Sequence, residues 1–303
     1  MNGLFGLLLA PFAMCVILTG IHCYLGLHIV SRGVIFVDLA LAQVAALGGT
    51  VALLAGYELG STETYLISLG FTFFGAAVFA LGRMREESVP QEAIIGIVYA
   101  VSSAAAILVL DRAPHGEEAI KAMLVGSILF VTWPQIVKIS VIYLAVGVLH
   151  FLLRKRFLLI SMDPGLARQK GLRIRFWDFI FYMTFGFVVT SSVRVAGVLL
   201  VFSYLVVPAV CAMFFVRSVS SRLVMGWGIG FAASVLGLCT SAKWDLPTGA
   251  SVVTVFGATL ILCAATRSIM RAACRRTLNE ERRTEHAARS AVSHLFRRFA
   301  GRT

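Results

Sequence analysis

Long apolar segments recur along the chain at lengths that suit membrane-spanning helices. A bilayer core of about 30 Å needs roughly 20 apolar residues in a helix. Nine segments approach or reach that length: 4–30, 34–56, 64–82, 91–110, 134–153, 176–193, 195–216, 223–241 and 248–266. The pattern predicts an all-α, polytopic membrane helical bundle with about nine transmembrane helices.

Two places leave the number of spans open. Arg194 separates the sixth and seventh segments with almost no connection, which would also suit a broken helix or a re-entrant hairpin. Such backbone is tolerated at membrane depth only where protein buries it or where it lines a cavity. Residues 122–132 are apolar but too short to span, and we expect them to dip partway into the membrane. Nine spans is therefore the prediction, with eight or ten as the alternatives.

Composition supports the membrane class and excludes an ordinary soluble enzyme. Of the 303 residues, 59% are hydrophobic and only 14% are charged, whereas soluble domains average about 25% charged residues. The net charge of +12 comes from bases in short connections and in the C-terminal tail. This distribution argues against a nucleic acid partner. The first segment lacks a basic start and a clear cleavage site, so we expect a retained helix rather than a signal peptide.

The placement of the bases also predicts an orientation. The connection between the fifth and sixth segments carries seven Lys and Arg residues against Asp163, whereas the connection between the fourth and fifth is net acidic. With nine spans and the N-terminus outside, every base-rich connection lies in the cytoplasm. The C-terminus then lies in the cytoplasm too.

The chain divides after its last span. Residues 1–266 form the predicted transmembrane domain, and residues 267–303 form a basic cytoplasmic tail with ten arginines against three glutamates. Four apolar tail residues recur at helical spacing: Val292, Leu295, Phe296 and Phe299. This spacing predicts a helix lying on an anionic membrane surface. The alternative is a basic tail that only fixes the topology.

The sequence carries no signature of an enzyme. It has no GxxxxGK[ST] loop to hold the phosphates of a nucleotide, no nucleophile elbow and no HExxH pair. The six cysteines form no CxxC pair, and five lie inside apolar segments, where they are expected to pack. If ATP drives this protein, a separate chain must hydrolyse it.

The base-rich connection contains the signals of a short helix with two caps. Asp163 suits the N-cap and Pro164 the first helical position, Ala167 lies inside, and Gly171 suits a C-terminal cap. We expect an amphipathic helix on the cytoplasmic side that contacts a partner. The alternative is a solvated loop.

A second feature is the apolar stretch between Gly197 and Pro208. Pro208 must kink or break a helix, because proline removes one helical hydrogen bond. Broken helices are common on the substrate paths of transporters, and a purely structural kink is the alternative. Further along, Asp245 and Pro247 suit an external turn in which Asp245 caps the last helix.

Four stretches, in this order, resemble the ABC-3 family of permeases. They are Glu92-Ala-Ile-Ile-Gly-Ile-Val-Tyr-Ala100, Asp163-Pro-Gly-Leu-Ala-Arg-Gln-Lys-Gly171, the segment from Val193 through Gly197 to Pro208 and Ala209, and Asp245-Leu-Pro-Thr-Gly249. The resemblance covers nearly everything between residues 32 and 266. The tail lies outside it.

The resemblance implies a function and a set of partners. ABC-3 permeases are membrane subunits of bacterial ATP-driven importers for zinc, manganese and iron. The likeness implies a homodimer in the inner membrane with an ABC ATPase subunit and an external substrate-binding protein. It also implies that residues 163–171 form the coupling helix, with Asp163, Pro164, Ala167 and Gly171 as its motif. No permanently bound cofactor is implied, because the divalent metal is cargo and the ATP belongs to the partner.

Asp38 is the predicted ligand on the substrate path. It is the one ionisable residue that falls cleanly within a span, and burying a charge there is costly. The family carries an aspartate followed four residues later by a histidine at this place. The expected path residues are therefore Asp38, Gln43, Gly197 and Pro208, with Asp38 as the metal ligand.

The family histidine is missing from this sequence. If Asp38 matches the family aspartate, Ala42 stands at the histidine position; if Gln43 stands there instead, the aspartate position is Leu39. Asp38 and Gln43 are five residues apart, about 140° around a helix, so they do not share a face. We therefore expect a weaker gate, ligands from elsewhere or a different cargo.

The remaining histidines add little to a metal site. We expect His22 and His28 to be hydrogen-bonded packing residues, His115 to lie in a solvated loop, and His150 to have no special role. Two other functions stay open on the sequence. One is a gradient-driven secondary transporter, and the other is a relative that transports no metal because its site has decayed.

Overall fold

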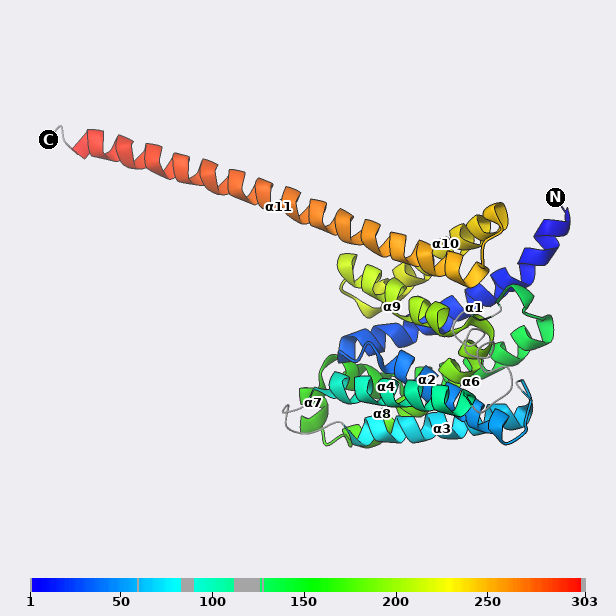
Figure 1. The fold of residues 1–303 in the computed structure, drawn as a ribbon. Coiled ribbons are helices and arrows are strands. Elements are labelled where there is room, and N and C mark those ends of the chain that lie inside the picture. Colours follow the sequence, from blue (N-terminus) through cyan, green and yellow to red (C-terminus); the bar gives the residue numbers. More distant parts are fainter. Residues whose placement is uncertain (1, 59, 83–89, 112–125, 127, 301–303) are drawn as a thin grey trace. The chain divides into compact units, whose positions relative to one another are not determined.

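The chain is a bundle of long helices. The structure, a computed structural model, describes residues 2–58, 60–82, 90–111, 126 and 128–300, without the side chains of 2–5, 7 and 276–300. Within these residues all regular structure is helical (Figure 1). The long helices are α1 (Asn2–Arg32), α2 (Val37–Leu54), α3 (Thr62–Leu81), α4 (Gln91–Leu110), α6 (Trp133–Met162), α8 (Ile174–Ala196), α9 (Val198–Phe215), α10 (Val219–Trp244) and α11 (Thr248–Ala300).

Each long helix of the described chain is apolar and long enough to cross a membrane, so the predicted nine spans are confirmed there. Two short elements complete the fold: a 3₁₀ turn (η1, Ile128–Phe130) and α7 (Pro164–Gln169). Polar side chains begin some of the helices. The Ser61 hydroxyl accepts a hydrogen bond from the Thr64 N–H before α3, and Ser218 caps α10 in the same way.

The described chain forms two units. Residues 1–259 are one compact bundle, and residues 260–303 are a second unit that continues α11 as a helix to Ala300. The predicted apolar face of the tail involves side chains outside the described set. Its membrane contact and the division at residue 267 therefore stay predictions.

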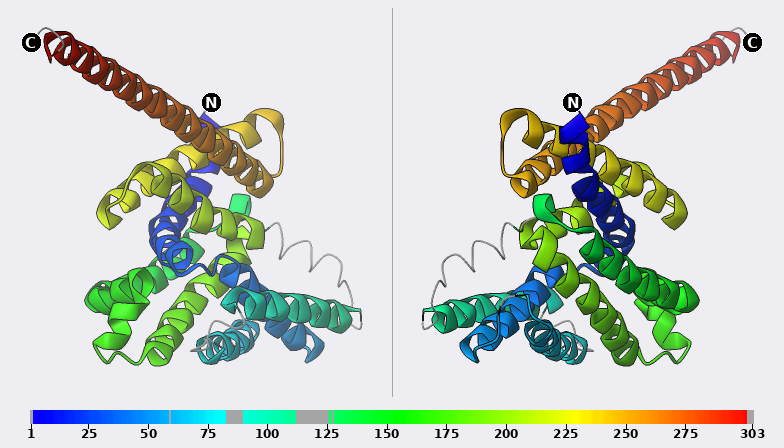
Figure 2. Two further views of the ribbon diagram at one scale, coloured as in Figure 1. Left: turned by 90° about the vertical axis from the view of Figure 1, so that its left-hand side faces the viewer. Right: turned by 90° about the vertical axis from the view of Figure 1, so that its right-hand side faces the viewer.

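Within the first unit the helices form two groups. α2 packs against α3 and α4, while α1 packs against α9, α10 and α6 (Figure 2). α8 joins the groups because it contacts α3, α6 and α2. α1 and α9 approach each other closely, because the backbone of Gly26 lies against the Leu205 carbonyl.

Two ends of this bundle matter for the site. At the Arg32 end, the chain leaves α1 and α3 and enters α2 and α4. At the same end α6 is followed by the short α7 and then by the start of α8. At the Gly197 end, α2 finishes, α3 and α6 begin, and α8 meets α9. Helices of about 20 residues or more separate the ends by about 30 Å.

The structure bears on three predictions for the connections. The helix break falls at Gly197; of the kink or break expected at Pro208, the break is absent, because α9 continues to Phe215. Asp245 does not cap the last helix; it ends α10 in a left-handed conformation with φ of 49°. Of the segment 122–132, the described part holds the turn η1 and Gly126, whose backbone lies against Ala196.

Candidate functional site

Asp38 lies in the first turn of α2 with its side chain inside the bundle. It is 1% exposed, and among the described residues neither carboxylate oxygen has a hydrogen-bond partner. An unpaired carboxylate at such a depth is costly. Asp38 therefore stays a functional candidate, as the sequence predicts.

Gln43 lies on another face of α2. It is partly exposed, together with Leu39 and Leu47, which lie four residues before and after it. The structure does not bring Asp38 and Gln43 together, as their spacing predicts. Leu39 and Gln43 lie on this partly exposed stripe, four residues apart like the aspartate and histidine of the family. Neither of them supplies a carboxylate or an imidazole.

The described residues contain no group of three His, Cys, Asp or Glu side chains that could hold a metal ion. Among the predicted path residues, Gly197 lies at the end of the bundle opposite to Asp38, about 30 Å away along α8. Pro208 is buried in α9, and its carbonyl faces Gly226 of α10. The four path residues thus form no single cluster within this chain.

The predicted capped helix is present as α7. Asp163 accepts a hydrogen bond from the Leu166 N–H at 2.8 Å, Pro164 occupies the first helical position, and Gly171 follows the helix with φ of 72°. Ala167 is 0% exposed, whereas Leu166 is 37% exposed. The helix is thus anchored on one side and open to a partner on the other.

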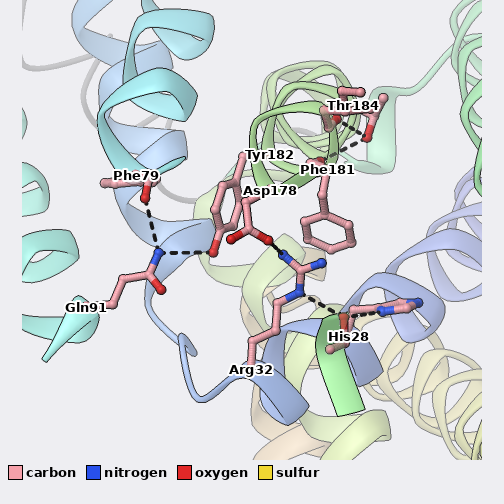
Figure 3. A network of polar contacts seen from close by, with 10 residues as sticks. His28, Arg32, Phe79, Gln91, Asp178, Phe181, Tyr182 and Thr184 are labelled. Atoms are coloured by element: carbon pink, nitrogen blue, oxygen red, sulfur yellow. Dashed lines mark hydrogen bonds and ion pairs between the residues drawn. The ribbon is translucent and has the colours of Figure 1, made fainter. Parts of the chain in front are cut away.

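A buried ion pair lies beside α7 at the Arg32 end (Figure 3). An Arg32 guanidinium N–H donates to the Asp178 carboxylate at 2.9 Å, and the Arg32 Nε–H donates to the Ser161 hydroxyl at 2.8 Å. The guanidinium also lies 3.9 Å from the centre of the Phe181 ring. These contacts join α1, α6 and α8 two residues before the cap of α7.

Further polar contacts extend this network. His28 shares a hydrogen bond with Ser161, and His150 shares one with Thr184, both at 2.8 Å. The ring of Tyr24 lies between these histidines. A separate link joins α4 to its neighbours: Gln91 donates to the Phe79 carbonyl at 3.2 Å and to the Tyr182 hydroxyl at 3.3 Å.

The sequence model of the ABC 3 transport family matches residues 6–267, which is most of the chain. The chain belongs to the ABC 3 transport family. The match ends at residue 267, one residue beyond the end of the predicted resemblance, and leaves out the rest of the tail. The protein is accordingly a multi-pass membrane subunit of a transporter.

Relatives within the ABC 3 family have similar lengths. The chain is 28% identical over 213 residues to the manganese transport system membrane protein MntC of Listeria monocytogenes, covering 68% of this chain and 75% of the relative. It is 26% identical over 268 residues to the chelated iron transport system membrane protein YfeD of Yersinia pestis, covering 84% and 86%. The solved structure of PsaBC from Streptococcus pneumoniae in complex with Fab has the same fold, with a TM-score of 0.71 at 20% identity, covering 85% of this chain and 90% of that one.

In this ABC 3 family chain the Arg32–Asp178 ion pair was not among the predicted features. Arg32 counted only as a base of a connection, and Asp178 was overlooked although it lies within the predicted span 176–193. His150, for which no special role was expected, is buried at 1% exposure and shares a hydrogen bond with Thr184. One signal was available: a buried aspartate inside a span needs a cation, and Arg32 ends a span at the same side of the membrane in the predicted topology.

Proposed function

We propose that the chain is the permease subunit of an ATP-driven importer of divalent metal ions. It works as a homodimer with a separate ABC ATPase and an external substrate-binding protein. Membership of the ABC 3 family supports this role, and the named relatives favour manganese or iron as cargo, with zinc as a further candidate. The observation that carries the proposal is α7, a capped helix with an open outer surface.

The proposed orientation follows the charges. Seven bases lie in α7 or within ten residues of it in the sequence, so the Arg32 end lies in the cytoplasm, with the N-terminus outside and the C-terminus inside. The ATPase then meets the outer surface of α7 around Leu166. Movement of α7 acts on Ser161 and through it on Arg32, which ties α6 to α1 and α8. This link gives a physical route from the ATPase to the spanning helices.

The metal path in the proposed dimer runs along the axis between two copies. Gln43 lies on a partly exposed stripe of α2 and can face that axis, while Asp38 lies behind the stripe. Gly197 and Pro208 define the neighbouring α8–α9 region. Gln43 offers one amide oxygen, a weaker ligand for a divalent transition metal than an imidazole. We therefore propose a path that holds its cargo loosely.

Transport assays test the function directly. The chain is reconstituted with its ATPase and binding protein, and ATP hydrolysis is measured with manganese, iron, zinc and cobalt. We expect stimulation by at least one metal and loss of stimulation in Asp38→Ala. Activity that is indifferent to every metal would contradict a metal cargo. Metal uptake by the chain without its ATPase would instead indicate a secondary transporter.

The coupling role of α7 has its own test. In Ala167→Arg, a charged side chain replaces a fully buried methyl group and displaces α7, so metal-stimulated hydrolysis should fall to the unstimulated rate. Ala93→Arg is the control, because Ala93 is an exposed alanine near the start of α4 at the same end. Wild-type stimulation in Ala167→Arg would show that α7 is not the coupling element.

A further inference from the structure

A cavity of about 420 Å³ lies at the Gly197 end, among α2, α3, α6 and α8. α2 contributes small residues to its lining, including Ala46 and Gly49, so the helix leaves room there. A volume of this size is typical of sites for small molecules. The cavity is far from α7, and the proposed coupling does not use it.

The charged residues of the cavity lining are two cations, Lys138 and Arg194, and the lining has no carboxylate. Both cations lie by the same ring: the Lys138 Nζ is 5.7 Å and the Arg194 guanidinium carbon 5.3 Å from the centre of Tyr65. The single ion pair of the described chain is Arg32–Asp178, so neither of these cations has a carboxylate partner there. Two cations that line one cavity repel each other, and a negative charge bound in that cavity would stabilise both.

The cavity also holds its hydrogen-bond donors in place. Arg194 donates to the Gly60 carbonyl at 2.9 Å, which fixes the guanidinium and leaves other N–H groups free. The Tyr65 hydroxyl is bonded to the Ser191 hydroxyl at 3.0 Å, which holds the ring that both cations approach. The Gln135 carbonyl oxygen accepts from the Thr132 N–H at 2.9 Å, so its NH₂ group remains as a donor at the cavity. Positioned donors around a guanidinium fork match the oxygens of phosphates and carboxylates.

We propose that this cavity binds a phosphate or carboxylate group. A bare divalent cation is excluded by the same charges, so the site is separate from the metal path and does not rest on the proposed transport function. Two sources supply this chemistry at a membrane surface. One is the phosphate of a lipid headgroup, and the other is a soluble anion such as a carboxylate chelate of a metal.

The test uses the purified full chain and three variants. Lys138→Gln and Arg194→Gln each remove one cation of the cavity. Lys243→Gln is the matched control, because Lys243 also lies over an aromatic ring, 5.3 Å from the centre of Trp244, at the same end but outside the lining. Calorimetric titration with inorganic phosphate and with citrate measures the soluble source. Native mass spectrometry of the purified chain measures retained anionic lipid.

We expect binding in one of the two measurements to weaken by roughly tenfold or more in both cavity variants and to stay unchanged in Lys243→Gln. Arg194→Lys keeps the charge but loses the planar fork, so it should bind with intermediate strength. Circular dichroism and gel filtration check that each variant is folded. The measurement that responds identifies the source. Absence of both anion binding and retained lipid in the wild type, or equal binding in wild type and both cavity variants, would overturn the proposal.

Discussion

Arg32 is held on three sides by groups of different kinds. A carboxylate, a hydroxyl and an aromatic face surround one guanidinium, and the side chains of the pair Arg32–Asp178 are 2% and 0% exposed. Water cannot replace either partner at such depth. The attraction within the pair therefore offsets the cost of burying both charges only while both are present.

Removal of one partner should therefore destabilise the bundle strongly. We expect Asp178→Asn to lower the free energy of unfolding by about 3–5 kcal/mol, because it leaves the guanidinium without its counter-charge. Thermal unfolding in detergent measures the change. Glu63→Gln, an exposed acid in the first turn of α3, should shift stability by less than about 0.5 kcal/mol.

A double variant separates charge from packing. Arg32→Met with Asp178→Leu removes both charges, and it should be more stable than Asp178→Asn alone. If Asp178→Asn and Glu63→Gln had the same free energy of unfolding, the Arg32–Asp178 pair would have no part in holding α1 to α8.

The backbone conformation of Gly197 leads to a second prediction at the scale of single residues. Its φ of 79° and ψ of 158° lie in a region that is essentially restricted to glycine. Gly197→Ala should cost about 1–3 kcal/mol of stability, measured by thermal unfolding. Gly96→Ala is the control, because a Cβ added to this exposed helical glycine meets no atom within 4 Å. Equal melting temperatures for the two variants would contradict this account of the break between α8 and α9.

The candidate site could be predicted only in part. Asp38 was identified because a carboxylate inside an apolar segment is rare, and its separation from Gln43 follows from helix geometry. Gln43, and not Asp38, lies on the partly exposed stripe of α2. That placement depends on how the neighbouring helices pack against α2, which no local sequence pattern specifies. The pairing of Arg32 with Asp178 joins residues 146 positions apart, and periodicity carries no information at that distance.

At the scale of elements, α1 and α9 pack with no room for a side chain at Gly26. A Cβ added to Gly26 would lie 1.8 Å from the Leu205 carbonyl oxygen, which is backbone and cannot turn aside. Small residues allow such approaches between membrane helices. This contact fixes the position of α9 and with it the segment around Pro208.

Gly26→Ala should therefore force the two helices apart. We expect a loss of about 1–3 kcal/mol, the usual cost of overpacking, in the free energy of unfolding. Gly20→Ala tests the same change in the same helix at a position with open space within 4 Å, and it should be neutral or slightly stabilising. A Gly26→Ala protein as stable as Gly20→Ala would show that α1 and α9 can separate at little cost.

At the scale of the whole molecule, the proposed orientation can be measured. The six native cysteines are replaced, and a single cysteine is introduced by Thr62→Cys at the Gly197 end or by Arg168→Cys in α7; both positions are exposed. An impermeant thiol reagent added to intact spheroplasts should label the first variant alone. Labelling of the α7 variant before permeabilisation would reverse the orientation.

The spans themselves were the most predictable part of the fold. Length and hydrophobicity decide whether a segment crosses a membrane, and the nine predicted segments correspond to the nine long helices of the described chain. Their ends were less predictable. α6 continues to Met162, well beyond the predicted end at residue 153, because the basic residues 154–156 and the residues after them remain helical. Pro208 was expected to kink or break its helix, and α9 continues through it as a helix.

The glycines along α1 and α10 restrict how the molecule can change shape. A Cβ on Gly226 would lie 2.3 Å from the Cys23 sulfur, and one on Gly230 would lie 2.6 Å from the Thr19 methyl group, so both positions lack room for a side chain, although less severely than Gly26. α1 thus packs closely against both α9 and α10, and any change of shape that separated these helices would have to break those contacts. The connection 33–36 joins this group to α2 and its neighbours.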